Sequence, residues 1–124
     1  MLAGSIAGVQ AQGQTQSKIK KVRQYVEFSE DVKVGSTVLK SGSYLVTSND
    51  NQELTFRRAL PDPAYTSQMV LDNRTKPVVV KTTATVLDSK SKGTHVDMPK
   101  DSAGVAILKS ITLDDTNVKF TIDQ

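Results

Sequence analysis

Short runs in which apolar and polar side chains alternate recur along this chain, with clusters of turn-forming residues between them. Residues 22–28 show the pattern, since Val22, Val26 and Phe28 share one side and Tyr25 lies on the other. A period of two belongs to a β-strand, because successive side chains point to opposite faces of the sheet. Such runs at intervals of about 8–12 residues are typical of antiparallel sandwiches and barrels. The sequence therefore predicts an all-β protein.

The residue composition also favours strands over helices. Of the 124 residues, 15 are Val, 5 are Ile and 13 are Thr, whereas Leu and Ala number only 9 and 8. β-branched side chains are stiff at χ1 and suit a pleated surface better than a helix. No stretch sustains the apolar spacing of an amphipathic helix. A helical bundle is therefore not expected.

The alternating runs and turn signals predict about eight to ten short strands. Gly35 and Ser36 form a two-residue hairpin signal between two of these runs. The expected fold is an antiparallel β-sandwich, Ig-like or jelly-roll-like, with a barrel as the alternative. The predicted strands are residues 22–28, 32–34, 37–39, 43–47, 53–58, 65–71, 78–87, 94–98, 103–113 and 117–122.

Three local features carry further expectations. Residues 59–63 hold two prolines and are predicted to be a loop. The three consecutive valines at 78–80 predict burial on both faces where the longest run begins. Gly104 marks an expected bulge within the run 103–113.

The first residues differ in character from the rest of the chain. Residues 1–11 are small, apolar and uncharged, and Val9 and Ala11 stand at the −3 and −1 positions of a signal-peptidase site. We interpret residues 1–17 as the remnant of a signal peptide or as an N-terminal arm, and residues 18–124 as one β-sandwich domain. This interpretation predicts a protein that is secreted, periplasmic or held at the cell surface.

A spaced motif runs through residues 28–56. Its two parts are V-x-V-G-x-T-x-L and G-x-Y-x-V, matched at Val32, Val34, Gly35, Thr37, Leu39, Gly42, Tyr44 and Val46. The segment resembles small uncharacterised secreted bacterial all-β proteins, although these often have Pro-Ala before the second glycine, where this chain has Lys40 and Ser41. The resemblance implies a β meander, export and a bacterial source. The motif holds no catalytic residues.

Residue types that serve catalysis or metal binding are few. The chain has no cysteine, no tryptophan and a single histidine, which excludes disulfide frameworks, thiol chemistry and Cys-rich zinc sites. His95 and Asp97 share one face of a predicted strand, but without a G-x-S-x-G motif we interpret them as a surface pair. Asp97, Asp101, Asp114 and Asp115 offer oxygen ligands suited to calcium, yet Asx turns also explain their positions. We expect no enzyme, no cofactor and no metal site.

The positive charge of the chain is concentrated near its start. Sixteen Lys and Arg face thirteen Asp and Glu, and four of the basic residues are Lys18, Lys20, Lys21 and Arg23. We interpret this patch as a solvated strand start, with contact to polyanions or a membrane surface as the functional alternative. Nucleic-acid binders spread positive charge along a face and add stacking aromatics, so no nucleic-acid partner is expected. Stable membrane insertion is not expected either, because the apolar start is too short to span a bilayer.

The first functional hypothesis is a non-enzymatic structural protein. Sheet edges carry unpaired N–H and C=O groups, and an uncharged apolar arm can add to such an edge as a strand. The chain would then be a subunit of an extracellular fibre or matrix that self-associates through β edges or the arm. The donor-strand anchors would be Leu2, Ile6 and Val9.

The alternative hypothesis is a monomeric periplasmic or secreted binding module for a small ligand or a protein partner. Its contact residues would be Tyr25, Tyr44, Tyr65 and Arg57. Arg57 and Arg58 alternate faces in a strand, so only one of the pair can join a given surface. A concave aromatic patch is the feature that this hypothesis predicts.

Overall fold

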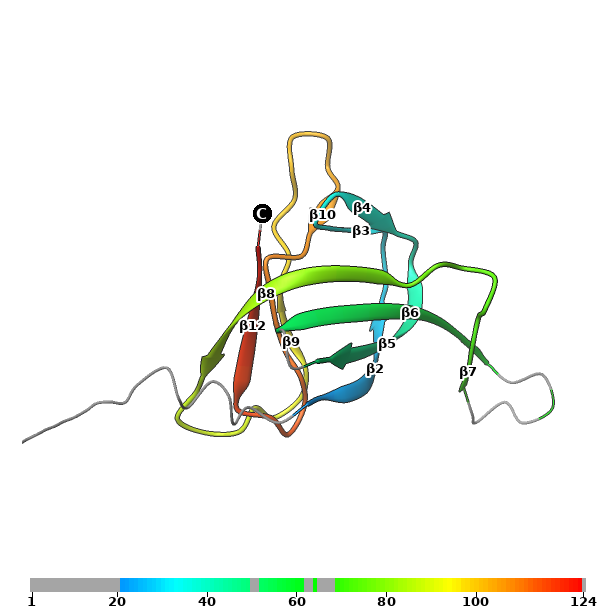
Figure 1. Ribbon diagram of the computed structural model, residues 1–124. Coiled ribbons are helices and arrows are strands. Elements are labelled where there is room, and N and C mark those ends of the chain that lie inside the picture. Colours follow the sequence, from blue (N-terminus) through cyan, green and yellow to red (C-terminus); the bar gives the residue numbers. More distant parts are fainter. Residues whose placement is uncertain (1–20, 50–51, 62–63, 65–68, 124) are drawn as a thin grey trace, which may run out of the picture.

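The computed structural model describes residues 21–49, 52–61, 64 and 69–123 (Figure 1). These residues form strands and turns, and none of them is helical. Within these ranges there is accordingly no helix long and apolar enough to cross a membrane. The all-β prediction is confirmed. The strands are β2 (Arg23–Phe28), β3 (Val32–Val34), β4 (Thr37–Leu39), β5 (Gly42–Ser48), β6 (Glu53–Pro61), β7 (Met69–Leu71), β8 (Val78–Val86), β9 (His95–Asp97), β10 (Ala106–Ile107), β11 (Ser110–Thr112) and β12 (Val118–Ile122).

The strands form one large sheet and one small one. The large sheet has the order β2-β5-β6-β8-β12-β11-β9, with β7 paired to β6. Its strands β5, β6 and β8 run side by side while β12 crosses their direction, so the sheet curls into a half-barrel (Figure 1). The small sheet, β10-β3-β4, lies at one end of this half-barrel. Its β10–β3 pair is parallel, whereas the other ladders are antiparallel.

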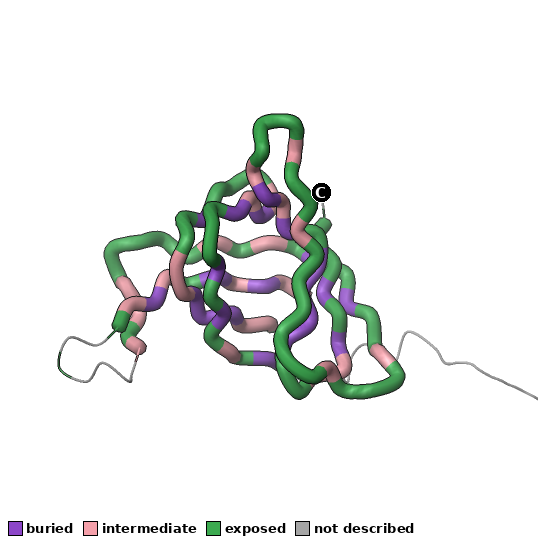
Figure 2. The backbone as a smooth tube through the Cα atoms, turned by 180° about the vertical axis from the view of Figure 1, so that it is seen from behind, coloured by how far each residue is buried: buried purple, intermediate pink, exposed green. Residues whose placement is uncertain are grey.

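Both sheets contribute to one core. Alternation decides which side chains enter it: on β12, Val118, Phe120 and Ile122 are buried, and the two residues between them are exposed. The small sheet adds Val32 and Val34, both fully buried. Figure 2 shows buried positions interspersed with exposed ones along several strands. Each large apolar side chain that is fully buried stabilises the fold by about 1.5–3 kcal/mol.

The hairpin predicted at Gly35 and Ser36 is present between β3 and β4. Gly35 has a φ of +61° at the first turn position, the arrangement of a type II′ hairpin. A Cβ atom at Gly35 would lie 3.2 Å from the Cγ1 atom of Val80, so the hairpin packs directly on β8. This contact brings the small sheet against the large one.

The predicted loop over residues 59–63 is wrong at its start, because β6 continues to Pro61. Pro61 pairs with Met69 of β7, beyond the last β5–β6 pair at Ala59. Its missing N–H group therefore interrupts no ladder in the centre of the sheet. Of the strand predicted over residues 65–71, β7 is the part that lies within the described residues.

Two further predictions are wrong, because burial or sheet membership changes along a single run of residues. Val79 is 52% exposed, since only one face of β8 is covered there. Gly104 lies in a turn with a φ of +82° and not in a bulge. The run 103–113 divides into β10 in the small sheet and β11 in the large one. Leu108, fully buried between them, donates its backbone N–H to the carbonyl of Lys33.

Candidate functional site

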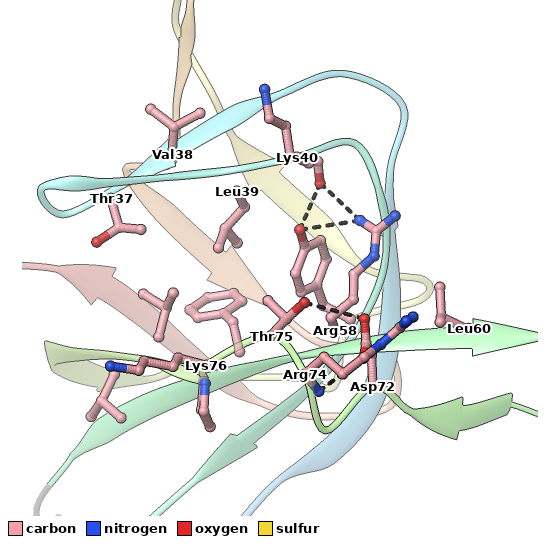
Figure 3. A pocket seen from close by; sticks show the side chains of 15 residues that line it. Thr37, Val38, Leu39, Lys40, Arg58, Leu60, Asp72, Arg74, Thr75 and Lys76 are labelled. Carbon is pink, nitrogen blue, oxygen red and sulfur yellow. Dashed lines mark hydrogen bonds and ion pairs between the residues drawn. The ribbon is translucent and has the colours of Figure 1, made fainter.

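A pocket of about 760 Å³ opens between β4, the second half of β6 and the loop that joins β7 to β8 (Figure 3). Pockets for small ligands typically measure about 300–1,000 Å³ and are lined mainly by apolar side chains. The apolar part of this lining is formed by Val38, Leu39, Phe56, Leu60, Pro77, Val78 and Val79. The pocket therefore has the size and the lining of a ligand site.

The pocket is the open end of the core. On β6 the inward positions read Leu54, Phe56, Arg58 and Leu60, because every second residue faces the same side. The first two are fully buried, whereas Arg58 and Leu60 are only partly covered and line the pocket. An arginine thus occupies a position that the strand period assigns to the interior.

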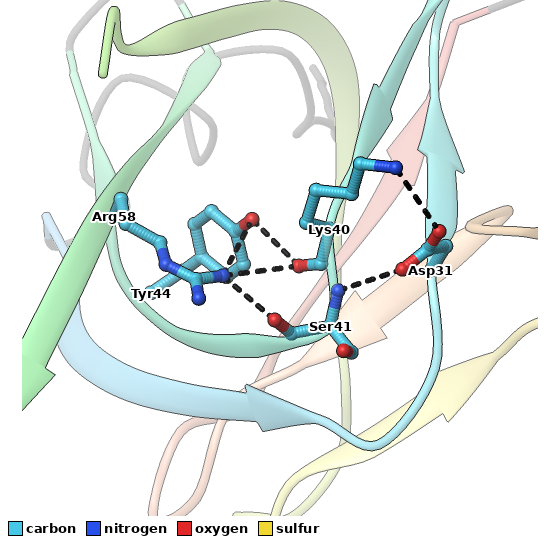
Figure 4. A network of polar contacts seen from close by, with 5 residues as sticks. All are labelled: Asp31, Lys40, Ser41, Tyr44 and Arg58. Atoms are coloured by element: carbon cyan, nitrogen blue, oxygen red, sulfur yellow. Dashed lines mark hydrogen bonds and ion pairs between the residues drawn. The ribbon is translucent and has the colours of Figure 1, made fainter.

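Backbone carbonyls and a tyrosine hold the guanidinium group of Arg58 (Figure 4). Its Nη1 atom donates to the carbonyl oxygen of Ser41 at 2.7 Å and to that of Lys40 at 3.3 Å. It also lies 3.2 Å from the hydroxyl of Tyr44, which itself donates to the Lys40 carbonyl at 2.7 Å. The Cζ atom stands 5.4 Å from the centre of the Tyr44 ring, within cation–π range.

Gly42 leaves the space that this guanidinium occupies. A Cβ atom at Gly42 would lie 2.5 Å from Nη1 and 2.7 Å from Cζ of Arg58. The φ of Gly42 is +137°, which L side chains rarely adopt. Residues 42 and 44 of the G-x-Y-x-V motif therefore accommodate Arg58, one through its missing side chain and the other through its ring and hydroxyl.

The loop from Asp72 to Lys76 forms the opposite wall. Asp72 Oδ1 accepts the backbone N–H of Arg74 at 3.0 Å, and Oδ2 accepts the Thr75 hydroxyl at 3.2 Å. The Arg74 Nε atom also pairs with Oδ1 at 3.4 Å. The hydrogen bond from the Arg74 backbone is the main cause that lowers the pKa of Asp72 below its ordinary value. The Asp72 carboxylate is thus engaged within its own loop.

Cationic side chains outnumber this carboxylate in the lining. Among the described residues that line the pocket, Lys40, Arg58, Arg74 and Lys76 are cationic and Asp72 is anionic. Lys40 pairs with Asp31 at 3.7 Å, and Arg74 pairs with Asp72. Within the described part of the chain, Arg58 and Lys76 have no carboxylate at ion-pair distance. The pocket therefore combines an apolar lining with a positive rim.

Of the contact residues expected for a binding module, the structure places one in the lining of the pocket and two elsewhere. Tyr44 lines the pocket, although its ring is almost fully buried and belongs mainly to the core. Tyr25 is 45% exposed on β2 and is not among the lining residues. Arg57 faces away from the pocket and borders a smaller cavity of about 70 Å³ beside Asn73. Tyr65 lies outside the described residues.

The structure brings Arg58 and the 72–77 loop to the pocket, and sequence reasoning missed both. The period of β6 was a sufficient signal for Arg58, because Leu54 and Phe56 already marked its inward side. No local pattern indicates that the 72–77 loop faces β4, because the two segments are far apart in the sequence and meet only in the folded sheet. The proposed strand donors Leu2, Ile6 and Val9 lie outside the described residues, as do Lys18 and Lys20 of the basic patch.

Of the four aspartates considered as calcium ligands, Asp101 and Asp114 accept hydrogen bonds from backbone N–H groups. Asp101 Oδ1 accepts the backbone N–H groups of Ala103 and Val105 at 2.9 and 3.0 Å. Asp114 Oδ1 accepts that of Gly93 at 2.8 Å. The ring of His95 contacts the Lys92 carbonyl at 3.0 Å, and its strand is fully exposed. Over the residues that the structure describes, no group of three His, Asp or Glu side chains could hold a metal ion.

The resemblance to small secreted bacterial all-β proteins stays a prediction. Comparisons with protein-family models, curated proteins and solved structures found no match to this chain.

Proposed function

We propose that this protein is a non-enzymatic, exported binding module whose pocket takes a small ligand with a substantial apolar part. The observation that carries the proposal is the pocket of about 760 Å³ at the open end of the core. Its apolar side chains would be shielded from water by such a ligand, and each buried methylene contributes about 0.8 kcal/mol. We assign binding and not catalysis, because the pocket's carboxylate is engaged by Arg74 and Thr75.

Two exposed threonines offer a matched test. Thr37 of β4 lines the pocket and pairs with the buried Val34, so its side chain faces inward. Thr85 of β8 is also exposed but is not part of the lining. Thr37→Trp should fill the pocket and Thr85→Trp should leave it open, while neither removes a core contact. The probe is the neutral dye N-phenyl-1-naphthylamine, whose fluorescence rises in apolar surroundings.

We expect saturable binding of one dye per protein, at least tenfold weaker binding in Thr37→Trp, and unchanged binding in Thr85→Trp. Circular dichroism would show that both variants keep the wild-type fold. A wild-type protein that binds no dye, or a Thr37→Trp variant that binds it as tightly as the wild type, would contradict the proposal.

A fibre subunit assembled by strand addition is the second candidate, and the edges of the large sheet favour it. Among the described residues, the six-residue strand β2 pairs with β5 alone, and β9 pairs with β11 alone. Each strand thus presents a row of backbone groups to which another chain can add. The donor would be the arm at residues 1–17, with Leu2, Ile6 and Val9 as its anchors.

Deleting residues 1–17 tests this candidate. Negative-stain microscopy and size-exclusion chromatography should show polymers for the full chain and a folded monomer after the deletion. Thr37→Trp serves as the control, because filling the pocket leaves the edges of the large sheet untouched. Assembly that persists without residues 1–17 is the outcome that excludes strand donation by the arm.

A further inference from the structure

We infer that Arg58 is the anchor for a negatively charged head group, so that the pocket is specific for amphipathic oxyanions. This inference rests on the proposed binding function and specifies its ligand class: an apolar body that carries one carboxylate, sulfonate or phosphate group. Three observations support the inference: which N–H donors of Arg58 already have partners, how the guanidinium group is held, and which charged groups surround it.

The protein uses one end of the guanidinium and leaves the other end available. Among the described residues, the hydrogen-bond partners of Arg58 are Ser41, Lys40 and Tyr44, and all of them contact Nη1. Nε and Nη2 have no partner among the described residues. These two nitrogens form the fork that binds the two oxygens of an oxyanion side by side, the geometry in which arginine exceeds lysine.

The fork is held in place before any ligand arrives. The backbone of Gly42 lies against the guanidinium, and the Tyr44 ring stands 5.4 Å from Cζ. Tyr44 and Arg58 are also directly opposite each other in the β5–β6 ladder. A group fixed in this way loses little side-chain entropy when it binds, so more of the interaction energy appears as affinity.

The surrounding charge favours an anion. The Asp72 carboxylate, which would otherwise compete for the fork, accepts hydrogen bonds from Arg74 and Thr75 of its own loop. Lys76 adds a second cation to the lining. Because the head group would bind beside low-dielectric apolar side chains, its attraction to Arg58 is stronger than in open water. Leu39, Phe56 and Leu60 line the remaining space for the apolar body.

Two dyes with the same ring system separate the head group from the body. 1-Anilinonaphthalene-8-sulfonate carries one sulfonate, and N-phenyl-1-naphthylamine is its neutral counterpart. We expect the wild type to bind the sulfonate dye at least tenfold more tightly. Arg58→Gln should weaken binding of the sulfonate dye about 10- to 100-fold, the loss expected for a charged hydrogen-bonding partner, and change binding of the neutral dye less than twofold.

Arg57→Gln is the matched control, because Arg57 is the adjacent arginine on the opposite face of β6 and should affect neither dye. Raising the salt concentration with the wild-type protein tests the same point without a variant, since screening should weaken the sulfonate dye alone. Displacement of the sulfonate dye by decanoate and by decyl phosphate, with decanol as the neutral reference, distinguishes a carboxylate ligand from a phosphate ligand.

The outcomes separate this inference from the proposed function. Equal affinity for both dyes, or tight binding of the sulfonate dye by a folded Arg58→Gln variant, overturns the role of Arg58 and leaves the apolar pocket standing. Failure of both dyes to bind the wild type overturns the binding function and the inference with it.

Discussion

At Gly42, both the backbone conformation of β5 and the position of the Arg58 guanidinium require a residue without a side chain. Replacing it with alanine would force the φ of +137° on an L residue and place a Cβ atom against the Arg58 guanidinium. We expect Gly42→Ala to lower the free energy of unfolding by about 1–3 kcal/mol. Urea denaturation followed by circular dichroism measures this change.

Gly104→Ala is the reference for backbone strain alone. Gly104 also has a positive φ, of +82°, but a Cβ atom there would meet nothing within 4 Å. The loss should be about 1–2 kcal/mol, the cost of an L residue in a left-handed conformation. Gly42→Ala should exceed this loss and should also weaken binding of the sulfonate dye, because Arg58 must move. Equal stability losses and an unchanged affinity would show that the guanidinium tolerates a side chain at residue 42.

Asp72 links the stability of the 72–77 loop to pH. The backbone N–H of Arg74 is the main cause that holds its pKa below the ordinary 3.8. Because folding lowers this pKa, the ionised carboxylate stabilises the folded state above pH 3.8, and that contribution is lost as the pH falls through the folded-state value.

Asp72→Asn should therefore be less stable than the wild type at neutral pH, and the difference should shrink towards low pH. Urea unfolding between neutral and acidic pH measures the difference. Thr75→Val keeps the carboxylate and removes one of its hydrogen bonds, so it should retain part of the pH dependence. A difference between Asp72→Asn and the wild type that stays constant with pH would contradict this account.

At the scale of elements, the strands differ in how firmly they are held. β6 pairs with β5 and β8 and, near its end, with β7. In the part of the chain that the structure describes, β9 pairs with β11 alone, and all three of its residues are exposed. We expect amide hydrogens of β6 to exchange with solvent far more slowly than those of β9, because edge strands open with little loss of buried contact. Hydrogen exchange measured by NMR on a dilute sample tests this order.

The dependence of hydrogen exchange on protein concentration tests a separate point, the pairing of sheet edges between molecules. Protection of β9 or β2 that rises with protein concentration would indicate pairing between sheet edges, as the fibre candidate requires. Protection of β9 that equals that of β6 at every concentration would contradict the expected order.

At the scale of the whole molecule, both sheets share one core. Val32 and Val34 of the small sheet belong to the same cluster of buried residues as Phe56 and Phe120 of the large one. We expect one cooperative unfolding transition, with the same midpoint by far-UV circular dichroism and by tyrosine fluorescence. Two separate midpoints would show that the small sheet unfolds independently of the half-barrel.

The sequence predicted most of the elements, because strand alternation and turn chemistry are local. The hairpin at Gly35 and the buried positions of β12 follow from these patterns. The predictions are wrong where a contact with residues distant in the sequence determines the local structure. Pro61 continues β6 because β7 pairs with it there. The run 103–113 divides because Leu108, just after β10, still donates its N–H group to Lys33 of the small sheet, whereas β11 belongs to the large one.

By itself, the sequence determined that this protein is all-β and which residues of most strands face the core, since both depend on a period of two along the chain. Only the tertiary structure decided that the large sheet curls and that β4 lies across from the 72–77 loop to form a pocket. It alone shows Gly42 and Tyr44 beside the guanidinium of Arg58. The reason is physical: a pocket is made by residues far apart in the chain, and their meeting depends on sheet order and curvature, which no local pattern specifies.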